Sequence, residues 1–137
     1  MENKLKIKSL AFAMVVGLVL FSDTEICGAD WRFLQKNFQG DFFYDAERIT
    51  RSSGNTVGIW LKIIYSEKFI KEEGFDDLKQ TIGLWEIDCK DKKACLLSTS
   101  HYAKEEEISS PQVWLPPEWK SIAPDTIMDA LYQELCK

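Results

Sequence analysis

The N-terminal 29 residues constrain the chain most, because they have the order of features found in a secretion signal. Lysines at positions 4, 6 and 8 precede an uncharged apolar run from Leu10 to Phe21, and a polar stretch leads to Cys27-Gly28-Ala29. Signal peptidases accept small residues at the third and first positions before the cut. We therefore predict a signal peptide over residues 1–29, cleavage between Ala29 and Asp30, and a mature domain over residues 30–137.

Two other interpretations of this segment fit less well. A membrane-spanning helix needs roughly 20 apolar residues, and this run is much shorter before Asp23 and Glu25 interrupt it. Acylation at Cys27 requires small, uncharged residues just before the cysteine, and Glu25 departs from that pattern. We expect no stable membrane insertion once the signal is removed.

Charge and length limit the class of protein. The chain has a net charge of −5, and residues 1–29 carry equal numbers of lysines and acidic residues, so the mature domain keeps that charge. An acidic domain lacks the basic surface patch that attracts nucleic-acid phosphates. Residues 30–137 are enough for one small domain with a thin core.

Strand patterns dominate the mature chain up to residue 102. The clearest strand is Thr56–Tyr65, which is rich in β-branched and aromatic residues. In the segment that ends at Cys89, apolar and acidic residues alternate, as expected of a half-buried antiparallel strand. Further strands are predicted at residues 31–34, 41–44, 49–51 and 94–102. Trp60 and Trp85 are expected to build the core.

The remaining segments predict connections and one late helix. Residues 66–77 are charged and are expected to hold a helical turn that ends at Gly74, and residues 105–107 are expected to form a solvated loop. Thr126 and Asp129 resemble a capping box, and apolar residues recur every four positions from Ile127 to Cys136. We predict an α+β fold, with a single antiparallel β-sheet of about five or six strands and a C-terminal α-helix packed on one face.

The cysteines fit an exported protein. Removal of the signal leaves Cys89, Cys95 and Cys136, and an oxidising compartment favours one disulfide among three possible pairs. Cys89 and Cys136 both lie on surfaces where the sheet and the helix should meet, so we predict that they pair. The rival pair Cys89–Cys95 would cross a tight turn with its side chains on opposite faces. Cys95 is then expected to be a free, half-exposed strand residue.

The sequence predicts no catalytic, cofactor or metal site. His101 is the single histidine, and no second histidine or Cys-x-x-Cys pair accompanies it in a metal-ligand spacing. Strand alternation places Ser100 and His101 on opposite faces, which argues against a nucleophile and base pair. The glycines form no phosphate-binding loop. We expect a protein that is not an enzyme and binds no cofactor.

Two tryptophans flank the Pro116-Pro117 pair, which excludes regular structure. One interpretation of Trp114 and Trp119 is that they seal an open end of the sheet. The other is an exposed aromatic ridge for a partner, since rigid aromatic residues dominate interface hot spots. Trp114 and Trp119 are our candidate partner surface.

The order of short motifs resembles the surface-adhesin protein E-like family of Gram-negative envelope proteins. The matching positions are Trp31, Phe43-Tyr44-Asp45, Ile49, Arg51, Asn55-Thr56-Val57, Trp60, Lys62, Glu86-Ile87-Asp88-Cys89, Leu97-Ser98, Trp119, Ile122, Pro124 and Cys136. Cys95 lies outside that pattern. The resemblance implies an antiparallel sheet backed by a helix and agrees with the Cys89–Cys136 pair.

The resemblance also implies a binding role in the periplasm or at the cell surface. The first hypothesis is an adhesin-like domain without enzymatic activity that binds another macromolecule, with a protein partner on the host surface or in the extracellular matrix. The alternative is a small periplasmic accessory or inhibitor-like module that binds another envelope protein.

Overall fold

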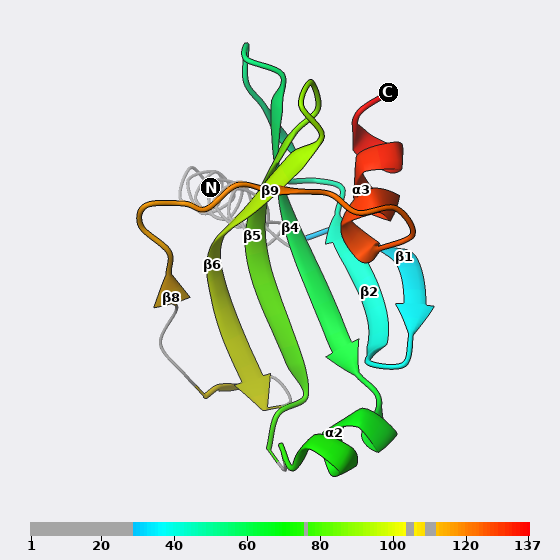
Figure 1. Ribbon diagram of the computed structural model, residues 1–137. Coiled ribbons are helices and arrows are strands. Elements are labelled where there is room, and N and C mark those ends of the chain that lie inside the picture. The colour runs from blue at the N-terminus through cyan, green and yellow to red at the C-terminus, as the bar shows by residue number, and fades with distance from the viewer. Residues whose placement is uncertain (1–28, 76, 104–105, 109–111) are drawn as a thin grey trace, which may run out of the picture.

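The computed structural model describes residues 29–75, 77–103, 106–108 and 112–137. The predicted signal peptide therefore lies outside the described residues except for Ala29. Within these residues the chain forms one antiparallel sheet and two helices (Figure 1). Neither helix among the described residues has the length and hydropathy of a membrane span.

The sheet contains nine strand segments, which is more than the five or six expected. The five long strands are β1 (Trp31–Asn37), β2 (Gly40–Asp45), β4 (Thr56–Tyr65), β5 (Gln80–Asp88) and β6 (Lys93–Ala103). The four two-residue strands are β3 (Thr50–Arg51), β7 (Glu106–Glu107), β8 (Gln112–Val113) and β9 (Lys120–Ser121). The main order is β1-β2-β4-β5-β6-β7, β3 pairs with β4, and β8 and β9 pair with β6.

The extra strands are too short to produce a periodic pattern in the sequence. Glu106 and Glu107, expected in a solvated loop, pair with Ala103 and Tyr102 of β6. The structure corrects that expectation because main-chain hydrogen bonds to a strand edge do not require apolar side chains. The long strands, by contrast, lie close to their predicted bounds.

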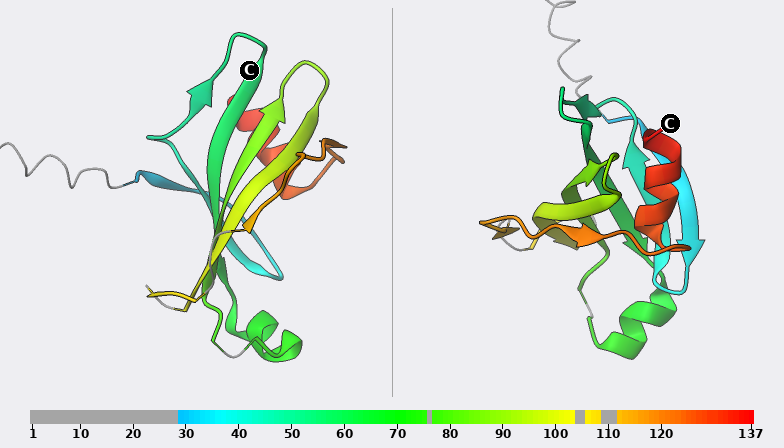
Figure 2. Two further views of the ribbon diagram at one scale, coloured as in Figure 1. Left: turned by 90° about the vertical axis from the view of Figure 1, so that its left-hand side faces the viewer. Right: turned by 45° about the horizontal axis from the view of Figure 1, so that its top comes forward.

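The core lies between one face of the sheet and the helix α3 (Ile127–Leu135). Alternate residues of β4, from Val57 to Ile63, are buried on this face, as the two-residue period of a strand requires. Leu131 and Leu135 of α3 pack against them. Figure 2 shows α3 on one side of the sheet, and we refer to that side as the helix-side face.

The two strand tryptophans differ in their location. Trp85 packs against the core, as expected. Trp60 lies between Ile59 and Leu61, which are both buried on the helix-side face, so its side chain is on the opposite face. There the Arg48 guanidinium lies 5.5 Å from its ring centroid. The expectation that Trp60 builds the core is wrong because strand alternation excludes it from the side that α3 covers.

Both helices begin with a side-chain cap, of which the sequence predicted the one at α3. In α2 (Glu67–Glu73) the Ser66 hydroxyl accepts a hydrogen bond from Phe69 N, and Gly74 ends the helix with a φ of 77°, a conformation that glycine adopts without strain. In α3 the Thr126 hydroxyl accepts from Asp129 N, and the Asp129 carboxylate accepts from Asp125 N. The predicted helical turn and the predicted late helix are confirmed.

The predicted disulfide is confirmed. Cys89, which directly follows β5, is bonded to Cys136 at the end of α3, with their Cα atoms 5.4 Å apart. Two hydrogen bonds add to this junction: the Tyr132 hydroxyl donates to Cys89 O, and Arg51 Nη1 donates to Leu135 O. The last turn of α3 is therefore joined to the sheet by the disulfide and by two hydrogen bonds, one donated by the helix and one donated by the sheet.

Removal of the disulfide should destabilise the domain strongly. The bond closes a loop over a sequence separation of 47, and the chain-entropy model assigns about 4 kcal/mol to a loop of that length. We expect the double variant Cys89→Ser with Cys136→Ser to unfold at a much lower urea concentration than the parent chain. A reductant should shift the parent midpoint and leave the double variant unchanged. Equal midpoints for parent and variant would contradict this role.

A second anchor lies at the end of β2, where the Asp45 side chain is completely buried. Its Oδ1 accepts hydrogen bonds from Asp30 N and Glu47 N, each 3.0 Å long. Its Oδ2 accepts a hydrogen bond from Arg48 Nε. Burial alone would raise the pKa of the Asp45 carboxyl, but these hydrogen bonds outweigh it and hold the pKa below its ordinary value.

Asp45 should therefore contribute to stability in a pH-dependent way. A lowered folded pKa gives stabilisation that is complete above the ordinary carboxyl pKa, about 3.9, and is lost as the pH falls through the folded value. We expect Asp45→Asn to lower the free energy of unfolding at pH 7 by about 2 kcal/mol and to reduce its loss between pH 5 and pH 2. Urea titrations at several pH values measure both effects. Asp91→Asn, in the exposed β5–β6 turn, is the control, and an identical acid profile for Asp45→Asn and the parent would contradict the assignment.

Candidate functional site

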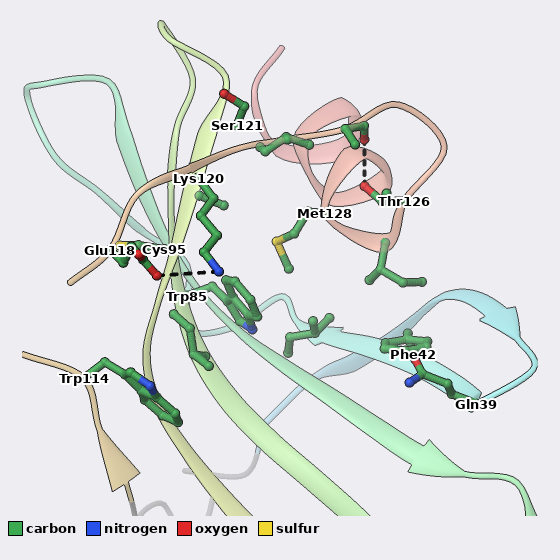
Figure 3. Close-up of a pocket in the computed structure, with 16 residues that line it drawn as sticks. Gln39, Phe42, Trp85, Cys95, Trp114, Glu118, Lys120, Ser121, Thr126 and Met128 are labelled. Atoms are coloured by element: carbon green, nitrogen blue, oxygen red, sulfur yellow. Dashed lines mark hydrogen bonds and ion pairs between the residues drawn. The ribbon is translucent and has the colours of Figure 1, made fainter. Parts of the chain in front are cut away.

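A cavity of about 560 Å³ opens on the helix-side face of the sheet. Its floor includes Leu61 of β4 and Trp85 of β5, and its walls include Met128 in the first turn of α3 and Trp114 in the segment that precedes β9. In Figure 3, Met128 points from α3 toward the space that Trp85 borders. The lining is mainly apolar, and the volume lies in the range of about 300–1,000 Å³ that is typical of ligand pockets.

A β-bulge helps to place Trp85 on this floor. Leu84 pairs with Ser98 whereas Trp85 pairs with Leu96, so Leu97 is the extra residue of β6. A bulge of this kind re-aims the neighbouring side chains and increases the local twist. The carbonyl of Leu97 accepts a hydrogen bond from Trp114 N. The same irregularity therefore positions both tryptophans that line the cavity.

The outer wall is the segment from residue 112 to residue 123, which we call the edge segment. β8 and β9 hold its two parts against β6. Between them, Pro116 and Pro117 have no N–H groups to donate to the β6 edge, and Leu115-Pro116 is a cis peptide. After β9 the chain crosses from the β6 edge to the start of α3 (Figure 1).

The edge segment exposes several large apolar side chains. Val113 is 63% exposed, Leu115 80%, Trp114 39% and Trp119 40%. Single exposed apolar residues are normal, but a concentration of them in one segment is typical of an interaction surface. Both predicted partner-surface residues, Trp114 and Trp119, are therefore accessible. Their function as a partner surface stays a prediction.

The structure separates the two tryptophans. Trp114 lines the cavity (Figure 3), whereas Trp119 is not among the residues that line it. Sequence reasoning missed Phe42, Leu61 and Met128 as residues that line the cavity, because an apolar side chain beside a cavity has the same sequence pattern as one in a filled core. Val113 and Leu115 flank Trp114 just before the two prolines, and this run of apolar residues outside a regular strand could have indicated an exposed apolar segment.

Charged groups lie only at the rim of the cavity. Lys120 Nζ and Glu118 Oε1 are 3.6 Å apart, and both side chains are about three-quarters exposed. Exposed ion pairs contribute little to stability. Figure 3 shows this pair on the edge segment, near Cys95 and Trp85. The cavity therefore offers an apolar interior with one pair of opposite charges at its mouth.

Cys95 is a free cysteine, as expected, but it is buried and not half-exposed. The edge segment runs alongside β6 on the side of this residue, which the strand pattern alone did not show. Burial, and secondarily the negative charge of Glu86, raises the pKa of the Cys95 thiol. A raised pKa lowers the thiolate fraction and argues against a redox function.

The thiol should react slowly in the folded protein. We expect a thiol reagent at pH 8 to modify Cys95 at least a hundredfold more slowly in buffer than in urea, because both burial and the raised pKa suppress the thiolate. Mass spectrometry gives the extent of labelling, and Cys95→Ala identifies any background. Equal rates with and without urea would contradict the burial.

His101 lies on the helix-side face away from the cavity lining. Its Nδ1 is 2.8 Å from Thr81 Oγ1, which in turn accepts a hydrogen bond from the Tyr65 hydroxyl. Ser100 pairs with Ile82 on the other face, as predicted. No group of three or more potential metal ligands occurs among the described residues.

Together, the elements define a class of domain: a single antiparallel sheet, closed on one face by a disulfide-bonded C-terminal helix, with an apolar cavity between the helix and an edge segment. The chain belongs to the surface-adhesin protein E family, whose model matches residues 31–137. The match predicted from short motifs is thereby confirmed.

Solved structures of protein E from Haemophilus influenzae share the fold. One structure has a TM-score of 0.52 at 15% identity, and the alignment covers 77% of this chain and 83% of the protein E chain. Its selenomethionine form has a TM-score of 0.51 at 14% identity, with 80% and 90% covered. Protein E from non-typeable Haemophilus influenzae has a TM-score of 0.51 at 16% identity, with 77% and 74% covered. Comparison with curated protein sequences finds no match.

Proposed function

We propose that this chain is an exported, non-enzymatic protein of the cell envelope that binds another protein through the cavity and the exposed edge segment. The family supports an adhesin-like surface protein. The observation that carries the choice of surface is the location of Trp114, which lines the cavity while its neighbours Val113 and Leu115 remain exposed.

A surface of this kind contributes binding free energy when a partner covers its apolar side chains. Each exposed apolar side chain contributes about 25 cal/mol per Å² when a partner removes it from water. A cavity with aromatic walls accepts one apolar side chain of the partner, and the exposed residues around it exclude water. This arrangement of one buried anchor and a surrounding rim is typical of interface hot spots.

The partner in this proposal is a protein of the host surface or the extracellular matrix. A net charge of −5 disfavours nucleic acid as a partner, because phosphate contacts require a basic surface. The periplasmic alternative, an accessory or inhibitor-like module, would use the same cavity for an envelope protein. The two hypotheses differ in where the domain lies in the cell: on the cell surface for the adhesin-like protein and in the periplasm for the alternative.

Surface labelling of intact cells is the first test. An adhesin-like protein must react with a membrane-impermeant amine reagent in intact cells, whereas a periplasmic module must react only after the outer membrane is permeabilised. A periplasmic protein labelled in the same samples is the control for leakage. Labelling only after permeabilisation would contradict the adhesin-like function and support the alternative.

Substitution of the tryptophans tests the surface itself. We expect Trp114→Ala with Trp119→Ala to reduce adhesion of cells that display the protein to an extracellular-matrix coat by about 30-fold, as loss of a hot spot of about 2 kcal/mol implies. The matched control is Phe33→Ala. Phe33 is also an exposed aromatic residue, 58% exposed, but it packs edge-on against Phe43 on the opposite face. Loss of adhesion in the control alone would place the binding surface on the open sheet face.

A further inference from the structure

The first residue of the predicted mature domain is held by both of its main-chain groups. Asp30 N donates a 3.0 Å hydrogen bond to Oδ1 of the buried Asp45 carboxylate, and Asp30 O accepts a 2.8 Å hydrogen bond from Ala46 N. The Asp30 side chain forms a separate, exposed ion pair with Arg32. The nitrogen of this residue is therefore fixed at a carboxylate that has no contact with solvent.

That nitrogen is also the atom that the predicted cleavage would change. Hydrolysis of the Ala29–Asp30 bond consumes one water molecule and leaves a carboxylate on Ala29. The proton of the new carboxyl group is taken up by the new amine on Asp30, because an α-amino group with a pKa of about 7.7–8.0 is mostly protonated at neutral pH. The donor at Asp45 would change from a neutral amide to an ammonium without any movement of the chain.

We propose that signal removal after Ala29 creates an ion pair between the Asp30 ammonium and the buried Asp45 carboxylate, so that processing itself stabilises the mature domain. This inference is independent of the binding function and rests on the predicted cleavage point. Two observations of different kinds meet here: the small-residue pattern in the sequence ends at Ala29, and the structure places the following nitrogen 3.0 Å from Asp45 Oδ1.

The charges around the new ammonium are defined. Arg48 pairs with the other oxygen of Asp45. Burial lowers the pKa of the Lys62 ammonium on β4 and the Asp45 charge partly offsets this, while the ammonium lies 4.4 Å from the Trp31 ring centroid. The Asp30 carboxylate is turned toward Arg32, and Glu47 contributes its main-chain N–H. Asp45 is thus the carboxylate that faces the Asp30 nitrogen directly, and a charge-assisted hydrogen bond there is stronger than the amide bond that it replaces.

The ion pair has a pH signature of the opposite sign to that of the Asp45 carboxyl. An acidic partner raises the pKa of the Asp30 amine, so its stabilisation is complete below the ordinary amine pKa and is lost as the pH rises through the raised value. A rise of about one unit corresponds to a tenfold change in the equilibrium constant for unfolding. An uncleaved or extended chain, which has an amide at this position, lacks that alkaline transition.

The test uses the complete chain, exported with its own N-terminal segment and purified from cells. One variant carries Gly-Ser inserted between Ala29 and Asp30, so that the mature chain begins two residues earlier and the Asp30 nitrogen remains an amide. Asp45→Asn is made in both backgrounds. Intact mass identifies the first residue of each product, and urea unfolding between pH 6 and pH 10 gives the equilibrium constants.

We expect the parent to begin at Asp30 and to be about tenfold more stable toward unfolding than the insertion variant at pH 7, with the difference lost by pH 10. The difference should also vanish in the Asp45→Asn background. If Asp45→Asn does not fold, the alkaline comparison of parent and insertion variant still decides the question. A parent that begins at another residue, or equal stability of the two chains at pH 7, would overturn the proposal and would leave the adhesion and labelling tests unaffected.

Discussion

The attachment of α3 to the sheet is the constraint on which the rest of the structure depends. A domain of this size has a thin core, and Leu131 and Leu135 supply much of what covers the buried face of β4. The Cys89–Cys136 bond fixes the last turn of that helix, and in its first turn Asp129 pairs with Lys92 of the β5–β6 turn. Because the helix is fixed at both ends, the apolar space beside its first turn is a defined cavity rather than a gap that the helix could close.

The sequence predicted the long elements well because each has strong local signals. Residues 56–65 form β4 as expected, Gly74 ends α2, and the Thr126 cap begins α3. The Cys89–Cys136 pair was predicted because both cysteines lie on surfaces where the sheet and the C-terminal helix were expected to meet. The two-residue strands β7, β8 and β9, the buried state of Cys95 and the outward side of Trp60 were not predicted, because each depends on which strand lies next to which, and that information is absent from local patterns.

The candidate site was predicted only in part for a related reason. Trp114 and Trp119 stood out because aromatic residues beside two prolines have no place in a regular strand. The other walls of the cavity come from β2, β4, β5 and α3, and their residues have the periodicity of ordinary core positions. The bulge that places Trp85 and the hydrogen bond that places Trp114 are both made at Leu97, a residue that strand periodicity does not distinguish from its neighbours. Since fold carries over between relatives better than function does, the cavity and not the family resemblance identifies the surface for experiments.

Hydrogen exchange of the exported protein with the disulfide intact and reduced tests this account most directly. We predict that reduction lowers the protection of amides in α3 and in the edge segment from residue 112 to residue 123 together, while β4 and β5 stay protected, because the helix and the edge segment enclose the same cavity. Unchanged protection of α3 after reduction, or loss of protection throughout the sheet at once, would contradict the claim that the covalent attachment of this helix shapes the site.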